Sequence, residues 1–198
     1  MIDIFSDLPT LENERVLLRP IQENDFYNLL YFSENEPELW FYGLVTAAGK
    51  QNLRHYIDTA VKNLNEKKEY PFIIFDKLTN SYAGSTRFYD IQQAYLTTQL
   101  GYTWYGKQFQ RTGLNRHCKF LLFSYVFEKW GLERCELRAD NNNQPSILAM
   151  KAIGCKPEGL LRNHMPTAQG TRRDSIILSI LKDEWLQGGK QKLLSLIK

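Results

Sequence analysis

The spacing of hydrophobic and polar residues predicts strands and helices in the first third of the chain. Apolar residues over 15–20 indicate a strand that Pro20 ends, and the polar residues 23–25 begin a helix. Between 50 and 65, apolar residues recur at the spacing of one helix face. The aromatic segment 34–49 has no such period, so we expect a loop that covers the core, with a substrate groove as the alternative.

Three strands are expected next. Apolar runs at 71–75 and 81–89 flank a polar turn at 76–80, which is a hairpin signal. A further strand over 97–105 follows the hairpin directly. Three consecutive strands of this kind should form an antiparallel meander.

The helix predicted over 113–129 is apolar on nearly all sides. Only a narrow polar stripe remains, at Arg116, Lys119 and Glu128. A helix of this kind lies buried in the middle of a domain. We expect Gly131 to end it in a left-handed conformation.

The last third of the chain alternates again between strands and helices. The pattern predicts, in order, a strand at 134–139, a helix at 145–153 and strands at 155–164 and 174–181. The strands on either side of the long helix should be parallel neighbours. This order indicates an α+β (mixed α/β) fold in one domain over 1–198, in which 187–198 forms a terminal helix or a frayed tail.

Composition and charge exclude several classes of protein. Apolar residues make up 43% and charged residues 24% of the chain, so it is not of the disordered class. The net charge of +3 argues against a dedicated nucleic-acid binder. No apolar run of about 18 residues indicates a membrane span, and residues 1–7 do not resemble a signal peptide, so we expect a cytoplasmic protein. The scattered Cys118, Cys135 and Cys155 indicate free thiols in a reducing compartment.

The loop 110–115 carries the first candidate chemistry. It fits a Q/R-x-x-G-x-G/A pattern, except that Asn115 stands where a small residue is expected. A loop that opens a helix leaves backbone N–H groups free at the positive end of the helix dipole, where they suit a pyrophosphate. Gly113 would let the backbone approach the anion closely, and Arg111 would add a charged contact. The alternative is an ordinary helix start with Thr112 as its cap.

Other common chemistries find no support in the sequence. His55, His117 and His164 lie far apart and no Cys/His metal spacing occurs, so we expect no metal site. The chain contains no G-x-S-x-G serine elbow, and no G-x-G-x-x-G turn follows its first strand. It also lacks the P-loop of nucleoside triphosphatases.

Six segments in a fixed order resemble the GCN5-related N-acetyltransferase (GNAT) family, within it the ribosomal-protein N-terminal acetyltransferases. These segments are 15–20, 83–87, 100–104, 110–115, the residues Asp140, Asn143 and Ser146, and 152–154. The resemblance covers nearly the whole chain. It implies the GNAT fold, a mixed, mostly antiparallel sheet of about seven strands that is flanked by helices and contains a splayed parallel pair.

The resemblance implies acetyl-CoA as the cofactor and a set of residues that hold it. A free backbone amide in the strand at 102–104 would polarise the thioester carbonyl, and the pantetheine arm would lie along this strand. Ser146 would protonate the leaving thiolate, and its alternative role is a hydroxyl that bonds the backbone of the first helical turn. The implied cofactor-binding residues are Tyr102, Thr103, Trp104, Gln110, Arg111, Thr112, Gly113, Leu114, Asn115, Asn143 and Ser146.

The group that deprotonates the amine is left open by the sequence. Relatives often carry a glutamate where this chain has Gln99, which cannot accept a proton, and they often carry an Asn-x-Glu pattern where it has His117. His117 would face the nucleotide or the amine. Asp174 or an ordered water is an equal candidate for the base.

The leading function is therefore an acetyl-CoA-dependent N-acetyltransferase whose acceptor is a protein N-terminus or a small amine. The amine would attack the thioester directly in a ternary complex. The main alternative is a catalytically weak CoA-binding module or sensor, because Gln99 replaces the expected acid. A ribosome-associated protein using the basic tail is a weaker alternative. We expect no membrane partner, no direct nucleic-acid binding, and a monomer or homodimer.

Overall fold

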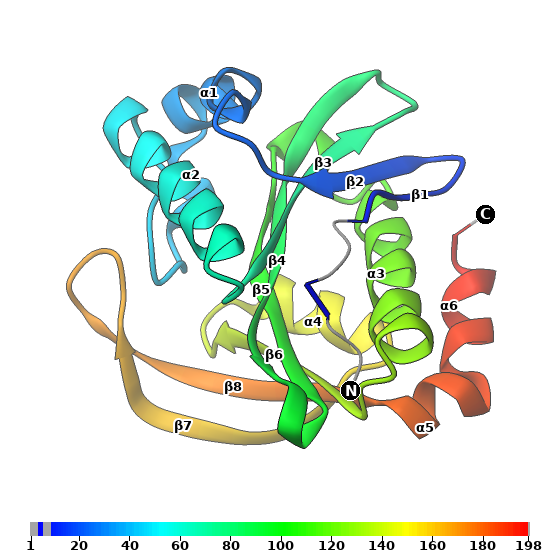
Figure 1. Cartoon of the computed structure of the whole chain (residues 1–198). Helices are drawn as coiled ribbons and strands as arrows, with labels where there is room; N and C mark the ends of the chain where they lie inside the picture. The colour runs from blue at the N-terminus through cyan, green and yellow to red at the C-terminus, as the bar shows by residue number, and fades with distance from the viewer. Residues whose placement is uncertain (1–3, 6–8, 198) are drawn as a thin grey trace.

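A mixed eight-stranded sheet forms the centre of the protein. The structure is a computed structural model that describes residues 4–5 and 9–197 (Figure 1). The strands lie in the order β1-β2-β3-β4-β5-β6-β8-β7, and of these neighbouring pairs only β5 and β6 run parallel. The strands are β1 (Leu11–Glu12), β2 (Val16–Pro20), β3 (Tyr70–Asp76), β4 (Ser81–Gln92), β5 (Thr97–Tyr105), β6 (Arg134–Asp140), β7 (Lys156–Pro166) and β8 (Arg172–Leu181). The prediction of a mostly antiparallel sheet with one parallel pair is confirmed.

The strand that the sequence did not predict is β1. It has two residues, and it pairs Leu11 with Leu18 and Glu12 with Leu17 of β2. Two residues are too few to show an alternation, so their strand character depends on the partner strand rather than on a local pattern.

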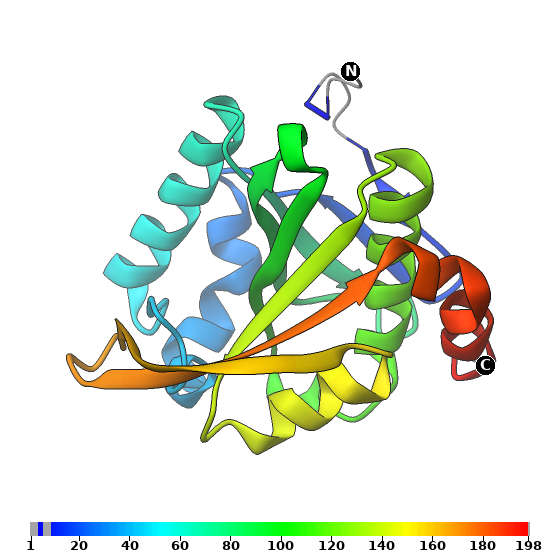
Figure 2. The same cartoon turned by 90° about the horizontal axis from the view of Figure 1, so that it is seen from below.

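Helices cover both faces of the sheet. Figure 2 shows α1 (Asp25–Asn35) and α2 (Lys50–Asn65) on one side and α3 (Leu114–Ser124) on the other. The helix α4 (Gln144–Ala152) follows β6 and packs against it. The apolar side chains that predicted α2 are the ones it buries against the sheet: Leu53, Tyr56, Ile57 and Ala60. Short 3-10 turns complete these connections: η1 (Pro37–Trp40), η2 (Gln93–Tyr95) and η3 (Lys107–Phe109).

The buried helix differs from its prediction in two respects. Its last turn, Tyr125–Lys129, is π-helical, and Gly131 follows with a φ of +67°, as expected. Lys119, expected in the narrow polar stripe of this helix, does not face solvent, because it is only 3% exposed. Its Nζ donates a hydrogen bond of 3.2 Å to Oγ1 of Thr103 on β5. An acceptor on the sheet lets a long amphipathic side chain take a core position.

The C-terminal segment packs against α3 (Figure 1). It consists of α5 (Lys182–Glu184), a π-helical turn at Trp185–Gly189 and α6 (Lys190–Ser195). Trp185 is fully buried and lies against the rings of Phe120, Phe123 and Phe127. No helix in the described part of the chain combines the length and apolar character needed to cross a membrane.

Candidate functional site

The parallel pair β5–β6 opens after three residues. Thr97–Gln99 pair with Arg134–Glu136, and no pairing of these two strands continues beyond Gln99. The strand β5 still pairs with β4 up to Tyr105, and β6 still pairs with β8 up to Asp140. One edge of β5 therefore carries backbone groups without a strand partner, which is the kind of edge that an extended ligand can pair with.

A β-bulge marks the middle of this open edge. Gly101 pairs with Arg87 and Trp104 pairs with Ser85, so Tyr102 and Thr103 together lie opposite Thr86. Tyr102 has a φ of +50°, which is uncommon for a residue other than glycine. Bulges re-aim the groups of the bulged strand and occur next to active sites. This is the segment in which the resemblance implied a free amide.

The side chains of the bulge point to opposite faces of the sheet. The ring of Tyr102 lies on the α2 side, 4.3 Å below the Arg87 guanidinium carbon. Thr103 points toward α3, where its Oγ1 lies 2.7 Å from Oγ1 of Thr86 and accepts the bond from Lys119. Trp104 is buried against Trp40 with ring centroids 5.1 Å apart. Their side chains are thus held by the core, which leaves the main chain of the open edge to meet a ligand.

The loop before α3 has the geometry of an anion site. Arg111 and Gly113 both have a positive φ, +61° and +89°, and α3 begins at Leu114. Among the described residues, the backbone N–H groups of Arg111, Thr112, Gly113 and Asn115 have no acceptor. A Cβ built on Gly113 would meet nothing within 4 Å, so open space lies outside these amides. Free amides at a helix start with space outside them suit a phosphate group.

The alternative of a threonine-capped helix start is not observed. The N-cap of α3 is Gly113, without a side-chain cap. Thr112 Oγ1 donates to the Phe109 carbonyl at 2.8 Å, and it lies 3.4 Å from the Leu114 nitrogen. At that distance its bond to the helix is weak, and most of the first-turn amides stay available.

Two side chains of the loop fasten it to the end of β5. Gln110 Nε2 donates to the Tyr105 carbonyl at 3.0 Å, and the Tyr105 hydroxyl donates to Asn115 Oδ1, also at 3.0 Å. Asn115, which stands where the loop pattern expects a small residue, therefore has a structural partner.

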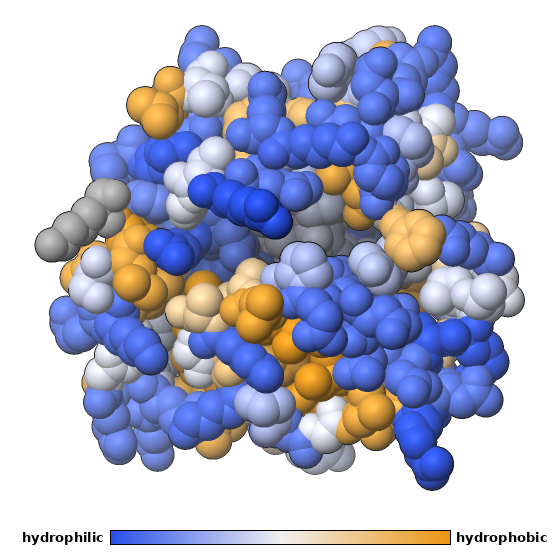
Figure 3. All heavy atoms as spheres, turned by 180° about the vertical axis from the view of Figure 1, so that it is seen from behind, coloured by the Kyte–Doolittle hydropathy of each residue, from blue (hydrophilic) through white to orange (hydrophobic). Residues whose placement is uncertain are grey.

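The face of the molecule opposite that of Figure 1 is visibly hollowed near its centre (Figure 3).

The start of α4 supplies the last of the implied cofactor contacts. Asn143 is the N-cap, and its Oδ1 accepts a 3.2 Å bond from the Ser146 nitrogen. The half-buried Ser146 hydroxyl takes part in no hydrogen bond within the described chain. The backbone-bonding alternative for this hydroxyl is thus not observed, and its role as an acid stays a prediction.

The two groups considered as the base have structural partners. His117 Nδ1 lies 3.2 Å from Asn13 Nδ2 and 3.4 Å from Glu14 Oε1, at the N-terminal strands rather than at the open edge. Asp174 Oδ1 accepts a 2.7 Å bond from the Asn163 nitrogen and so supports a bulge of β7, where Asn163 has a φ of +51°. The role of Asp174 as base stays a prediction.

Three residues to which the sequence assigned no role gather on the α2 side of the opening: Tyr56, Glu69 and Arg87. Arg87, 3% exposed, lies between the rings of Tyr56 and Tyr102 and donates to Glu69 at 2.7 Å. Its Nε and Nη2 are buried without a partner in the described chain. Nearby, Gln99 Nε2 donates to Asp90 Oδ2 at 2.7 Å. No local motif marks these residues, because they come from four separate segments.

The loop 34–49 and the β7–β8 hairpin meet beside this cluster. The Ala168 nitrogen donates to the Gly43 carbonyl at 3.2 Å, and Arg173 Nη1 donates to the Tyr42 carbonyl at 3.1 Å. Trp40 is buried, as expected for a loop that covers the core. The same loop also forms one wall near the opening, so both expected roles are compatible with its position.

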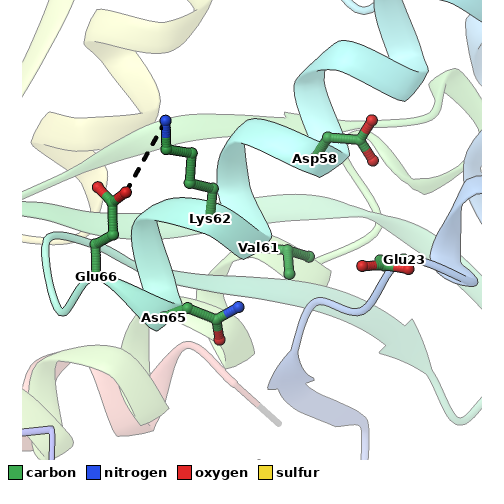
Figure 4. Close-up of a pocket in the computed structure, with 6 residues that line it drawn as sticks. All are labelled: Glu23, Asp58, Val61, Lys62, Asn65 and Glu66. Carbon is green, nitrogen blue, oxygen red and sulfur yellow. Dashed lines mark ion pairs between the residues drawn. The ribbon is translucent and has the colours of Figure 1, made fainter.

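Two further features bear on the location of the site. A surface hollow on α2 (Figure 4) shares no residue with the opening or with the loop before α3; its lining is Glu23, Asp58, Val61, Lys62, Asn65 and Glu66. Within the described ranges, no three His, Cys, Asp or Glu side chains are grouped to hold a metal ion.

Comparisons with known proteins agree with this geometry. A model described as an acetyltransferase (GNAT) domain matches residues 15–156. The chain is 26% identical to YoaA of Bacillus subtilis, which is named an uncharacterized N-acetyltransferase. The match extends over 174 residues, which are 88% of this chain and 97% of that protein. It is 29% identical over 105 residues, 53% of this chain and 56% of that protein, to YdaF of the same strain, provisionally named a ribosomal N-acetyltransferase. A GCN5-related N-acetyltransferase from Brucella melitensis has a TM-score of 0.88 and 25% identity, over 97% of this chain and 86% of that one.

Proposed function

Because the chain belongs to the GNAT acetyltransferase family, we propose that it transfers an acetyl group from acetyl-CoA to a primary amine. The amine attacks the thioester directly while both substrates are bound. The observation that carries this proposal is the unpaired edge of β5, which ends at the free amides before α3. Together they provide an extended edge for the pantetheine arm and an anion site for the diphosphate.

Each implied cofactor residue has a role in this proposal. The amides of Arg111, Thr112, Gly113 and Asn115 bind the diphosphate, and Leu114 begins the helix whose dipole favours it. The backbone at Tyr102, Thr103 and Trp104 pairs with the pantetheine arm, and an amide of the bulge polarises the thioester carbonyl. Gln110 fixes the loop to β5 through the Tyr105 carbonyl. Asn143 holds the α4 start, where Ser146 gives its proton to the leaving sulfur.

We further propose that His164 removes the proton from the amine. The nearby carboxylates are engaged: Glu69 with Arg87, Glu136 with Arg134 and Arg138, Asp140 with the Asn142 amide, and Asp174 with the Asn163 amide. His164 Nδ1, by contrast, is buried without a partner in the described chain. Burial and the charges of three arginines lower the pKa of His164, which keeps its imidazole neutral and able to accept a proton. Asp174 then positions His164 by holding the adjacent Asn163.

The donor half of the proposal is tested with matched glycine variants. Gly113 and Gly131 both have a positive φ and open space around the position of a Cβ, so valine imposes similar strain at either site. Calorimetric titration with CoA should show a loss of at least about 10-fold in affinity for Gly113→Val, because the side chain blocks the diphosphate site. Gly131→Val should bind CoA as the unaltered protein does. Equal CoA affinity of all three proteins would mean that the diphosphate does not bind at this loop.

The catalytic half is tested by thiol release from acetyl-CoA in the presence of an amine library. Release above background with at least one amine supports the transferase. The buried Gln99, bonded to Asp90 where relatives often carry an acid, favours the second candidate, a CoA-binding module without turnover. Tight CoA binding with no thiol release for any amine would establish that candidate instead.

A further inference from the structure

Arg173 on β8 is a buried cation that no carboxylate of the described residues contacts directly. It is 8% exposed, and its Nε donates to Ser175 Oγ at 2.9 Å while its Nη1 donates to the Tyr42 carbonyl at 3.1 Å. Both of these acceptors are neutral. No carboxylate of the described residues lies within salt-bridge distance of it. Asp140 acts on Arg173 without such a contact, and a buried charge that lacks a direct ion pair is costly.

The other buried or half-buried arginines of the described chain all have carboxylate partners. Each lies within 4.0 Å of a carboxylate oxygen: Arg15 with Asp76, Arg19 with Asp25, Arg54 with Asp58, Arg87 with Glu69, Arg134 with Glu136 and Glu158, and Arg138 with Glu136. The fold thus pairs its arginines consistently. The exception at Arg173 indicates that its partner is a ligand rather than part of this chain.

The position of Arg173 places that ligand at the acceptor side of the opening. In the β6–β8 register Arg138 lies opposite Ile177, so Arg138 and Arg173 share the face of the sheet that carries α1 and α2. Burial lowers the pKa of Arg173, and the charge of Asp140, which lies opposite Ser175 in the β6–β8 register, opposes this shift. The strands β5 and β6 part after the pair of Gln99 with Glu136, two residues before Arg138, so this face of β6 and β8 borders the open edge of β5.

We propose that Arg173 binds a carboxylate of the acceptor, with Arg138 beside it, so that the acceptor is an amino acid or a similar amino carboxylate. This inference deepens the proposed acetyl transfer and rests on it. A single guanidinium without a direct ion pair matches a singly charged carboxylate better than a phosphate dianion. A polyamine offers no anionic group to Arg173, and the backbone that follows a peptide N-terminus offers it only neutral carbonyl groups. The amino group of the acceptor reaches toward the bulge of β5 while its carboxylate stays at Arg173.

The reaction balances with the residues already named. The amine nitrogen forms a bond to the thioester carbonyl carbon, and the carbon–sulfur bond breaks. The amine attacks in its neutral form, His164 takes one proton from the nitrogen, and the sulfur receives a proton from Ser146. The proton on His164 returns to the Ser146 oxygen through solvent, so both residues regain their starting states. The products are the N-acetylated amino carboxylate and CoA, and no oxidant or reductant is needed.

The test compares amino acids with their carboxamides as acceptors. The amine of a carboxamide is less basic than that of the corresponding acid, so chemistry without a carboxylate site favours the carboxamide. We expect the unaltered protein to show the opposite order, with kcat/KM at least about 10-fold higher for the preferred acid. Arg173→Gln should lower kcat/KM for that acid by about 10- to 100-fold and leave neutral amines within about 3-fold. The exposed Arg162 supplies the control, because Arg162→Gln removes the same charge without reaching the cluster.

A binding measurement separates this inference from the proposed function. Calorimetric titration of the CoA-bound protein with the preferred amino acid should show binding that Arg173→Gln loses and Arg173→Lys partly retains. Thiol release with neutral amines but no preference for any acid over its carboxamide would overturn the carboxylate site and leave the transferase intact. CoA binding with no release for any amine would overturn the transferase and the inference together. If Arg173→Gln does not fold, the comparison uses Arg173→Lys, for which an unchanged acid preference and unchanged amino-acid affinity would overturn the site.

Discussion

At the scale of single residues, the proposed acceptor side depends on polar groups that the fold holds away from water. The Arg87 guanidinium stacks between two tyrosine rings and donates a hydrogen bond to Glu69. This stacking fixes the ring of Tyr102, the tyrosine of the β5 bulge. Stacking on both faces of a guanidinium adds cation–π attraction and restricts its motion. The bulge is thus supported by side chains of α2, of β4 and of Glu69 just before β3. Such support keeps a catalytic backbone amide in one orientation.

The first prediction concerns His164 as the general base. His164→Gln should lower kcat/KM by about 100-fold near pH 7.5, because glutamine cannot accept the proton. Burial and the nearby Arg138, Arg173 and Arg172 lower the pKa of His164 below 6.5. The neutral imidazole is therefore lost only as the pH falls through that lowered pKa, and the advantage over the variant should shrink there. Rate profiles between pH 5 and 9 measure this difference.

The exposed His55 provides the control for this experiment. His55→Gln removes an imidazole from the outer face of α2 and should leave the profile unchanged. If His164→Gln stayed within about 3-fold of the unaltered protein at every pH, the base would be another group, such as Asp174 or a water.

Single residues also show how far sequence reasoning reaches. The loop of Arg111 and Gly113 before a helix could be predicted because loop and helix are adjacent in sequence, and its role in binding the diphosphate stays a prediction. The positions of Arg173 and His164 could not be predicted, because the β7–β8 hairpin must first meet the loop 34–49, more than a hundred residues away. The burial of Lys119 could not be predicted for a related reason. Its acceptor, Thr103 Oγ1, comes close only when the helix packs on the sheet, and helical periodicity does not reveal such a contact.

At the scale of elements, the C-terminal helix completes the outer side of α3. Leu193 of α6 is 1% exposed, and Trp185 before it is enclosed by three phenylalanine rings of the α3 segment. Trp185 Nε1 also donates to Glu128 at 2.9 Å, and Lys190 forms an ion pair with the same carboxylate at 2.6 Å. The C-terminal segment therefore packs against and stabilises α3, the helix that begins at the proposed diphosphate loop.

The second prediction measures that support. Leu193→Ala should lower the free energy of unfolding by about 2–5 kcal/mol, because it removes buried methyl groups and leaves a cavity. Leu194→Ala, at a side chain that is 43% exposed, should change it by less than about 0.5 kcal/mol. Denaturant unfolding of the two variants gives both values. Equal stabilities would mean that α6 does not pack against α3 in solution.

Elements also differ in how far the sequence predicts them. The range of α2 was predicted at Lys50–Asn65 because its apolar face repeats over four turns. The strand β1 and the π-helical turn Tyr125–Lys129 were not predicted. A two-residue strand has no period, and a π-helical turn keeps the same apolar residues as an α-helix while changing only the backbone bonds.

At the scale of the whole molecule, the sheet separates two approaches to one opening. The loop before α3 and the start of α4 belong to the proposed donor side, whereas the α1–α2 loop and the β7–β8 hairpin belong to the proposed acceptor side (Figure 2). Both sides meet where β5 and β6 part. This arrangement allows donor and acceptor to be bound together, so acetyl transfer needs no carrier on the protein.

The last prediction follows from the cysteines, the strongest potential carriers. Cys118, Cys135 and Cys155 are at most 3% exposed, and burial raises the pKa of Cys118 and Cys155 to about 12 and that of Cys135 further. A buried, protonated thiol is a poor nucleophile. Initial-rate plots at several amine concentrations should therefore intersect, as a ternary complex requires, and mass spectrometry after incubation with acetyl-CoA alone should find no acetylated protein. Iodoacetamide should leave native activity unchanged while labelling all three thiols after unfolding. Parallel rate plots together with one acetyl group on the protein would show a covalent intermediate, and the direct attack proposed for this opening would then be wrong.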